Sequence, residues 1–146
     1  MRKSDEMLAL LERQRDLSVR LKELAGRQRL LIAEDDPSAL LGLLAERRKV
    51  MERLGEVTSQ VGPRPERLME GMCDAGARER AEGLLGQTRR NMREVMEGDS
   101  QDVRRLEVRR RDVSTRLGAI SGRAAMLRAY GSSSSGVGVL DQTDGG

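Results

Sequence analysis

The residues that could carry chemistry in this 146-residue chain are arginines, carboxylates and one cysteine. The sequence contains no histidine, so it offers no imidazole base and no imidazole metal ligand. Cys73 therefore has neither a histidine to activate it nor a second thiol for a disulfide, and we interpret it as a small apolar residue. We expect no enzymatic activity, no cofactor, no metal and no small-molecule substrate.

Arginine runs near residues 104–105 and 109–111 suggest a surface for nucleic-acid phosphates. Acidic residues interleave with them, however: Glu94, Glu97, Asp99, Asp102, Glu107 and Asp112. Since no face of a single sign results, we interpret the runs as a solvated helix face with ion pairs between successive turns. The only aromatic residue is Tyr130, so stacking platforms for single strands are also absent. Nucleic acid is the least favoured partner.

Two other patterns resemble sites but have simpler explanations. The acidic run 34–36 precedes Pro37, which is the sequence of a helix start and lacks the spacing of a calcium loop. Gly136 and Gly138 have no strand before them and no helix after them, as a phosphate loop would require. Neither pattern indicates a ligand.

The composition indicates the kind of elements present. Charged residues make up 35% of the chain and aromatic residues 1%, and the chain is rich in arginine, leucine, glutamate, alanine and methionine. This profile is typical of long helices and coiled coils. No apolar run reaches the ~18 residues of a membrane span, and the charged start does not resemble a signal peptide. We expect a soluble, cytoplasmic protein.

Heptad spacing predicts a first helix over about residues 4–33, with Ser4 as its N-cap. Leu10, Leu17, Leu24 and Leu31 recur every seven residues, and the neighbouring rows widen this stripe beyond a two-helix seam. A tight acidic turn follows, in which Asp36 is the N-cap and Pro37 the first residue of a second helix over about 37–58. The two helices predict an antiparallel hairpin.

The third long segment, about residues 77–130, carries two seven-residue ladders. The first comprises Leu85, Met92, Asp99, Leu106, Val113, Ile120 and Leu127. The second comprises Met96, Val103, Leu117 and Ala124, with Arg89 and Arg110 as polar members. The phase is unchanged across Gly98, which favours one helix over two. Between the hairpin and this helix, residues 62–76 contain a short helical piece at about 65–73.

The predicted fold is all-α: an antiparallel helical hairpin plus a long third helix, in an elongated three-helix coiled-coil bundle. We expect one helical domain over residues 1–130 and a disordered Gly/Ser-rich tail over 131–146. A third helix of roughly 80 Å cannot be covered by a hairpin of roughly 45 Å. The uncovered ladder predicts a partner-binding surface. Its residues are Val103, Leu106, Val113, Leu117, Ile120 and Leu127.

The sequence resembles the FlgN-type flagellar export chaperones. The resemblance lies in residues 24–32 (LAGRQRLLI), the acidic turn 34–36 and residues 40–48 (LLGLLAERR), and it extends to residues 106–110 and 129–131. Such chaperones hold the C-terminal helices of hook-associated (hook–filament junction) proteins and deliver them to the type III export gate. The resemblance implies that Tyr130 docks on the export-gate protein FlhA. The alternative is a structural coiled coil that homodimerises through its third helix.

Overall fold

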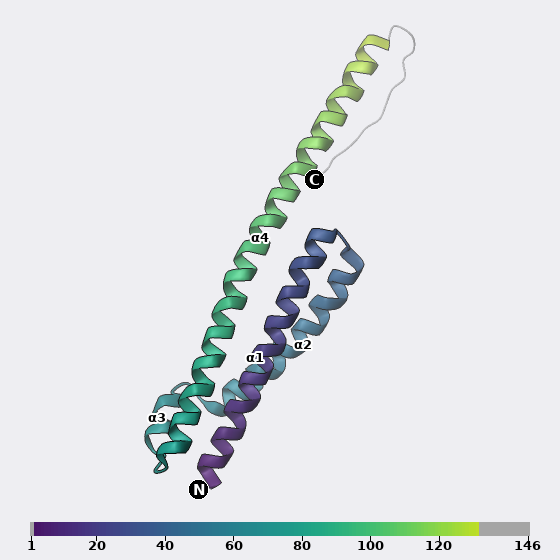
Figure 1. Ribbon diagram of the computed structural model, residues 1–146. Coiled ribbons are helices and arrows are strands. Elements are labelled where there is room, and N and C mark those ends of the chain that lie inside the picture. Colours follow the sequence, from purple (N-terminus) through teal and green to yellow (C-terminus); the bar gives the residue numbers. More distant parts are fainter. Residues whose placement is uncertain (1, 132–146) are drawn as a thin grey trace. The chain divides into compact units, whose positions relative to one another are not determined.

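The structure is a computed structural model that describes the backbone of residues 2–131 and the side chains of residues 3–129. Within these residues the chain forms four helices and no strand: α1 (Arg2–Glu34), α2 (Pro37–Val61), α3 (Pro65–Glu70) and α4 (Ala75–Gly131) (Figure 1). The all-α prediction is confirmed, with a hairpin followed by a long helix. The chain divides into two compact units, Met1–Val103 and Arg104–Gly146, which are described separately. The predicted tail lies outside the described residues from 132 onward.

Helix α1 begins two residues before the predicted N-cap, so Ser4 lies in its first turn. The wide buried stripe is confirmed, but of the predicted row only Leu24 is fully buried, whereas Leu10, Leu17 and Leu31 are half-buried because the neighbouring rows face the core. Among the fully buried side chains, Leu11, Ser18, Leu21 and Leu24 are each 0% exposed. A stripe of this width faces two neighbours, and α1 contacts both α2 and the first part of α4. Burial of each leucine contributes about 1.5–3 kcal/mol to the stability of the bundle.

The turn between α1 and α2 follows from three residues. Asp35 adopts a φ of 58°, the left-handed conformation that aspartate tolerates better than most residues. Asp36 is the N-cap of α2, and its carboxylate accepts a hydrogen bond from the Ala39 backbone N–H at 3.1 Å. Pro37 occupies the first helical turn, where its missing N–H has no partner to lose. The predicted cap and the hairpin are confirmed.

Helix α2 ends later than predicted, at Val61, because Gly62 supplies the φ of 90° at which the chain leaves the helix. Leu44 and Met51 have the seven-residue spacing of core residues, but Leu44 is 41% exposed and Met51 48% exposed. The buried residues of α2, which are Leu43, Val50, Leu54, Val57 and Val61, form a narrower stripe than that of α1.

The short helix α3 covers only Pro65–Glu70, less than the predicted piece, and ends at Gly71. Met69 and Met72 anchor this connection in the core, while Cys73 is exposed and not part of it. Arg78 donates hydrogen bonds to the Glu70 and Met72 carbonyl oxygens at 3.3 and 2.7 Å. These contacts fix where α4 begins.

Helix α4 is continuous through Gly98, as its unchanged phase predicts. A Cβ atom at Gly98 would lie 2.6 Å from Nη2 of Arg29, the end of a flexible and half-exposed side chain that can move aside. Gly98 does not end the helix.

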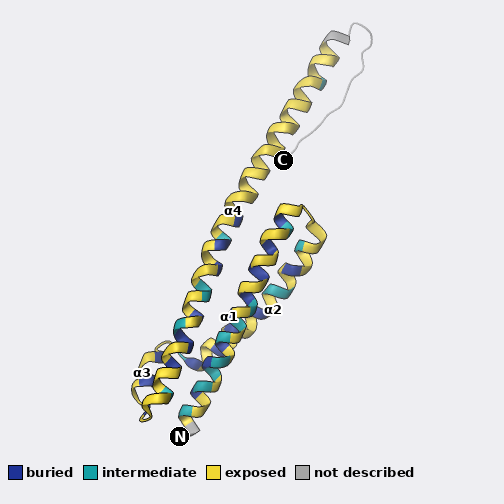
Figure 2. Cartoon of the chain, viewed as in Figure 1, coloured by how far each residue is buried: buried dark blue, intermediate teal, exposed yellow. Residues whose placement is uncertain are grey.

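The core of the first unit has two clusters (Figure 2). One lies where α1 begins and joins all four helices through residues such as Leu11, Val61, Met69 and Leu85. The other joins α1, α2 and α4 through Leu21, Leu24, Leu43, Val50, Leu54 and Val95. Because both clusters include α4, the hairpin and residues 75–103 of α4 form one three-helix core.

Candidate protein-binding surface

Three seven-residue rows of α4 explain how its two parts differ. The Leu106 row is the first predicted ladder, and the Leu117 row is the second. A third row, which we call the Val95 row, was not predicted. The Leu106 row lies between it and the Leu117 row on the helix surface. The members of the Val95 row are Ala81, Thr88, Val95, Asp102, Arg109, Arg116 and Arg123.

In the first unit, α4 packs through the Leu106 and Val95 rows. Leu85 is 6% exposed, Val95 3% and Asp102 2%. The Leu117 row does not pack there: Met96 is 59% exposed, and Val103, a residue of the predicted partner-binding surface, is 54% exposed. The Val95 row gave a weak signal because Thr88 and Asp102 are polar. Its position, three residues after each member of the Leu106 row, was the available clue.

A largely buried cluster of polar side chains from α1, α2 and α4 borders the second hydrophobic cluster. Arg47 of α2 donates two hydrogen bonds to the carboxylate of Asp99 of α4, one of them at 2.8 Å. The same guanidinium donates to Oε1 of Gln28 of α1 at 2.7 Å, and Gln28 Nε2 donates to Asp102 at 3.2 Å. The Nε atom of Arg29 lies 3.6 Å from Asp102. The cluster therefore ties all three long helices together.

This cluster explains the polar residues found on otherwise apolar ladders. Hydrogen bonding to Asp99 raises the pKa of Arg47 above its ordinary value, against the opposing effect of burial. The Arg47 side chain is 12% exposed and that of Asp99 34%. Asp99 is a polar member of the first predicted ladder, but its pairing with Arg47 was not predicted. Opposite charges at matching core positions of two helices were the signal for this ion pair.

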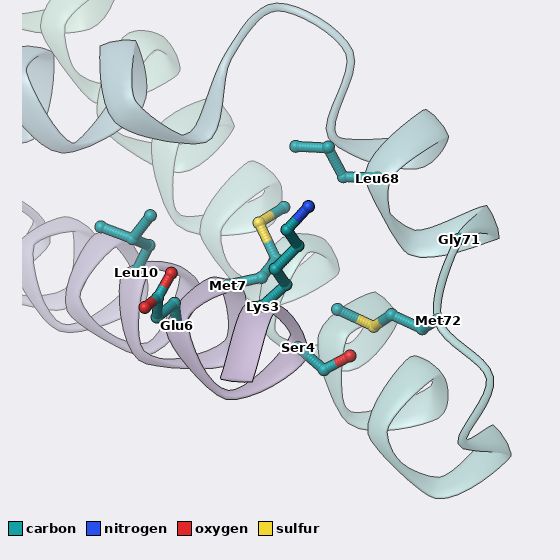
Figure 3. A pocket seen from close by; sticks show the side chains of 8 residues that line it. All are labelled: Lys3, Ser4, Glu6, Met7, Leu10, Leu68, Gly71 and Met72. Carbon is teal, nitrogen blue, oxygen red and sulfur yellow. The ribbon is translucent and has the colours of Figure 1, made fainter. Parts of the chain in front are cut away.

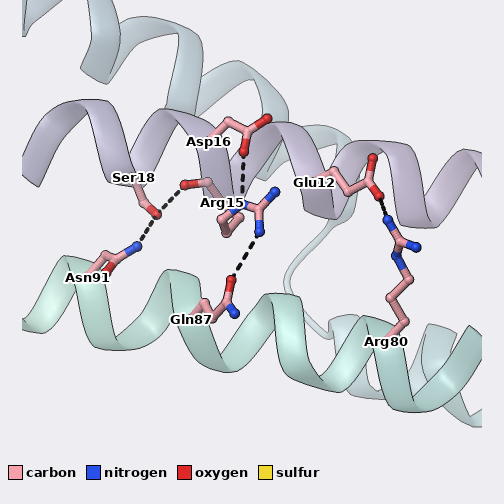
Figure 4. A network of polar contacts seen from close by, with 7 residues as sticks. All are labelled: Glu12, Arg15, Asp16, Ser18, Arg80, Gln87 and Asn91. Carbon is pink, nitrogen blue, oxygen red and sulfur yellow. Dashed lines mark hydrogen bonds and ion pairs between the residues drawn. The ribbon is translucent and has the colours of Figure 1, made fainter.

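A second set of polar contacts lies between α1 and α4 (Figure 4). Asn91 donates to the Ser18 hydroxyl at 3.1 Å, and that hydroxyl donates to the Arg15 carbonyl oxygen at 2.6 Å. Arg15 also donates to Gln87 at 3.2 Å, and Arg80 pairs with Glu12. Because Ser18 is small and fully buried, it allows this close polar contact within the bundle.

All six residues of the predicted partner-binding surface are exposed, and we call them the apolar seam. The exposed fraction ranges from 42% at Leu106 to 73% at Leu127. Heptad spacing places these six on one face of α4: Val103, Leu106, Val113, Leu117, Ile120 and Leu127. Figure 2 shows the second part of α4 as exposed at almost all of its described residues. The backbone of Tyr130 belongs to the last turn of α4, and its side chain lies outside the described residues.

The acidic residues near the arginine runs have other partners than the sequence analysis assumed. Glu94 pairs with Lys22 of α1 at 2.6 Å, Asp99 with Arg47, and Asp102 accepts from Gln28. These carboxylates serve the three-helix core. Within residues 104–129, only Glu107 and Asp112 remain to offset the arginines.

The first unit also has an open hollow of about 360 Å³ between the start of α1 and α3. Figure 3 shows the side chains of Met7, Leu68 and Met72 pointing toward one another across it. The titratable groups in its lining are Lys3 and Glu6. This lining offers apolar contact and no nucleophile beside a base.

Two general tests of the described part of the chain are negative. Among residues 2–131, no cluster of three or more cysteine, aspartate or glutamate side chains has an arrangement that could hold a metal ion. No helix described in this range combines the length and apolar character needed to cross a membrane.

Comparison of the chain with protein-family models, with curated proteins and with solved structures gave no match.

Proposed function

We propose that this protein is a cytoplasmic export chaperone of the FlgN type. It would hold the C-terminal helices of hook-associated flagellar proteins on the apolar seam and deliver them to the export gate. The observation that carries the proposal is the exposure of six large apolar side chains on one face of α4. An apolar row of this length on a helix surface is typical of a site for another helix.

The energetics of the seam support a reversible complex. Its side chains are about half exposed, so covering each contributes roughly 1 kcal/mol, and a matching partner helix contributes as much again. The gross gain is then roughly 12 kcal/mol, against a cost of association of about 4–15 kcal/mol. Apolar burial alone therefore gives weak to moderate affinity, as release at an export gate requires.

Two of the segments that carry the resemblance lie on either side of the turn between α1 and α2. Residues 24–32 lie near the end of α1, and residues 40–48 lie in the first part of α2. They flank the capped turn at Asp36. The proposed role of Tyr130 is to dock on FlhA from the end of α4, beside the seam in sequence.

The test is recovery of partners from the source cell with the full chain as bait. We expect a hook-associated protein to be recovered, and its binding to be lost in Leu117→Asp. The matched control is Thr115→Asp, which places the same charge two residues earlier, on roughly the opposite side of the helix. Equal recovery with Leu117→Asp and with the unchanged chain would contradict the proposal, as would recovery of no flagellar protein.

The same exposed seam favours a second candidate, a coiled coil that pairs with its own copy through α4. Sedimentation equilibrium of the full chain distinguishes the two. A stable dimer that Leu117→Asp converts to a monomer would support self-pairing and oppose a seam that is open to substrates.

A further inference from the structure

The second unit differs sharply from the first in charge. Residues 104–131 contain eight arginines against Glu107 and Asp112, a net charge of +6. Residues 1–103 contain 19 basic and 20 acidic residues, a net charge of −1. The positive charge of the protein is therefore concentrated on the segment that carries most of the seam.

The arginines are not spread evenly around this helix, because several border the seam. Arg116 and Arg123 belong to the Val95 row, which lies along one edge of the seam. Arg128 lies along the other edge, and Arg110 interrupts the Leu117 row. All four side chains are exposed. Arg116 pairs at 3.3 Å with Asp112, an exposed contact within the helix that a partner's carboxylate can replace at little cost.

These positions oppose pairing of the seam with a second copy of itself. In a parallel pair, Arg110 would face Arg110 of the other copy, and Arg123 would face Arg128. In an antiparallel pair that matches Val103 with Leu127, Arg116 would face Arg116. Like charges therefore meet in both alignments, and a self-paired seam is destabilised.

We propose that the occupant of the seam is an amphipathic helix of another protein whose apolar row is bordered by aspartate or glutamate. This inference rests on the proposed function in taking the seam as the binding surface, and it adds the chemistry of the partner. Carboxylates on both edges of such a helix would meet Arg116, Arg123 and Arg128, while its apolar row covers Leu117 and Ile120. Charge complementarity then selects the partner, and apolar burial supplies part of the affinity.

Nucleic acid could also bind a positively charged helix, but the apolar seam favours a protein partner. Phosphates do not use a row of exposed leucine, isoleucine and valine side chains, whereas a helix does. Residues 104–129 contain no aromatic side chain on which bases could stack.

The experiment uses the full chain and two labelled synthetic helical peptides of four heptads. Both carry leucine and isoleucine on the apolar row, and they differ only in having glutamate or lysine at the bordering positions. We expect the glutamate peptide to bind at least about tenfold more tightly in fluorescence anisotropy, and the difference to shrink as salt is raised. The full chain alone should sediment as a monomer.

Two double variants separate the position of the charges from their number. Arg116→Glu/Arg123→Glu changes arginines at the edge of the seam and should reverse the preference between the peptides. Arg104→Glu/Arg111→Glu makes the same change of charge, with the same spacing, on the side away from the seam, and should preserve it. Circular dichroism of both variants verifies that the helices remain.

Three results would overturn the inference: equal affinity for the two peptides, equal effects of the two double variants, or a stable dimer at micromolar concentration. Displacement of the glutamate peptide by a short DNA duplex at equal concentration would favour nucleic acid instead. Failure of the proposed function is distinguishable. Binding of the glutamate peptide without recovery of a hook-associated protein leaves this inference intact and removes the chaperone role. Recovery of that protein with no effect of Arg116→Glu/Arg123→Glu leaves the chaperone role intact and removes this inference.

Discussion

Replacing Arg47 by leucine removes the guanidinium that holds α2 to α1 and α4. Asp99 loses two charge-assisted hydrogen bonds and Gln28 loses one. Each such bond to a charged group contributes about 1.5–3 kcal/mol. Asp99 is 34% exposed and regains hydrogen bonds to water, so the loss is smaller than the sum of the three hydrogen bonds. Asp102, in contrast, is 2% exposed and loses a nearby positive charge. We expect Arg47→Leu to lower the free energy of unfolding by about 3 kcal/mol.

The double variant Arg47→Leu/Asp99→Leu tests the cause. If part of the loss in the single variant comes from the partly buried Asp99 carboxylate left without its partner, replacing that carboxylate as well restores part of the stability. We expect the double variant to be at least about 1 kcal/mol more stable than Arg47→Leu. Urea unfolding followed by circular dichroism gives the free energies. Hydrogen exchange resolved by mass spectrometry verifies that α1, α2 and residues 75–103 of α4 respond together.

Two results would refute this reasoning. A change below about 0.5 kcal/mol in Arg47→Leu would mean that the cluster is solvated and contributes little, as exposed ion pairs do. Additive effects of the two substitutions would mean that Arg47 and Asp99 are not energetically coupled.

Further predictions concern glycines and one carboxylate. Gly118→Ala and Gly122→Ala each place a Cβ in open space within a helix, and we expect each to raise the helical signal and stabilise the second part of α4 by about 0.5–1 kcal/mol. Gly62→Ala, at a φ of 90°, should instead lower the urea midpoint of the first unit. The ion pair with Arg89 lowers the pKa of Glu66 below its ordinary 4.5. Its contribution to stability is therefore present above pH 4.5 and lost as the pH falls through the lowered pKa. NMR titration should show this shift and its loss in Arg89→Met.

Much of the fold could be predicted from the sequence because its main signals are local. The capped turn at Asp36 and Pro37 depends on residues adjacent in the chain, and the continuity of α4 through Gly98 follows from a phase that two separate helices would not share. The exposure of Leu44 and Met51 could not be predicted in this way. Their spacing is that of core residues in α1, and only the number of neighbouring helices distinguishes the two cases.

The candidate site shows the same division. The exposure of the six seam residues was predicted, since the apolar rows of α4 are visible in the sequence and the predicted helix is longer than the hairpin. The Val95 row was missed because Thr88 and Asp102 are polar and are buried only by packing against other helices. The charge of the seam's edges was also misjudged. Adjacency in sequence suggested that Asp99 and Asp102 offset the arginines, but Asp99 accepts from Arg47 and Asp102 accepts from Gln28. The predicted pairing between successive turns does occur between Asp112 and Arg116.

The Val95 row and the Arg47 cluster together determine where the core of α4 ends. The row is uncharged and buried at Ala81, Thr88 and Val95, ends in the hydrogen-bonded Asp102, and becomes arginine from Arg109 onward, so packing of the first unit cannot continue along it. The Leu106 row alone would not prevent α4 from sliding by one heptad, since apolar residues recur at that spacing. Such a shift would place Leu106 or Met92 opposite Arg47 and leave a buried charge without its carboxylate. Asp99 therefore fixes the register of the bundle. By fixing it, Asp99 also determines which turn of α4 is the first to present the seam to a partner.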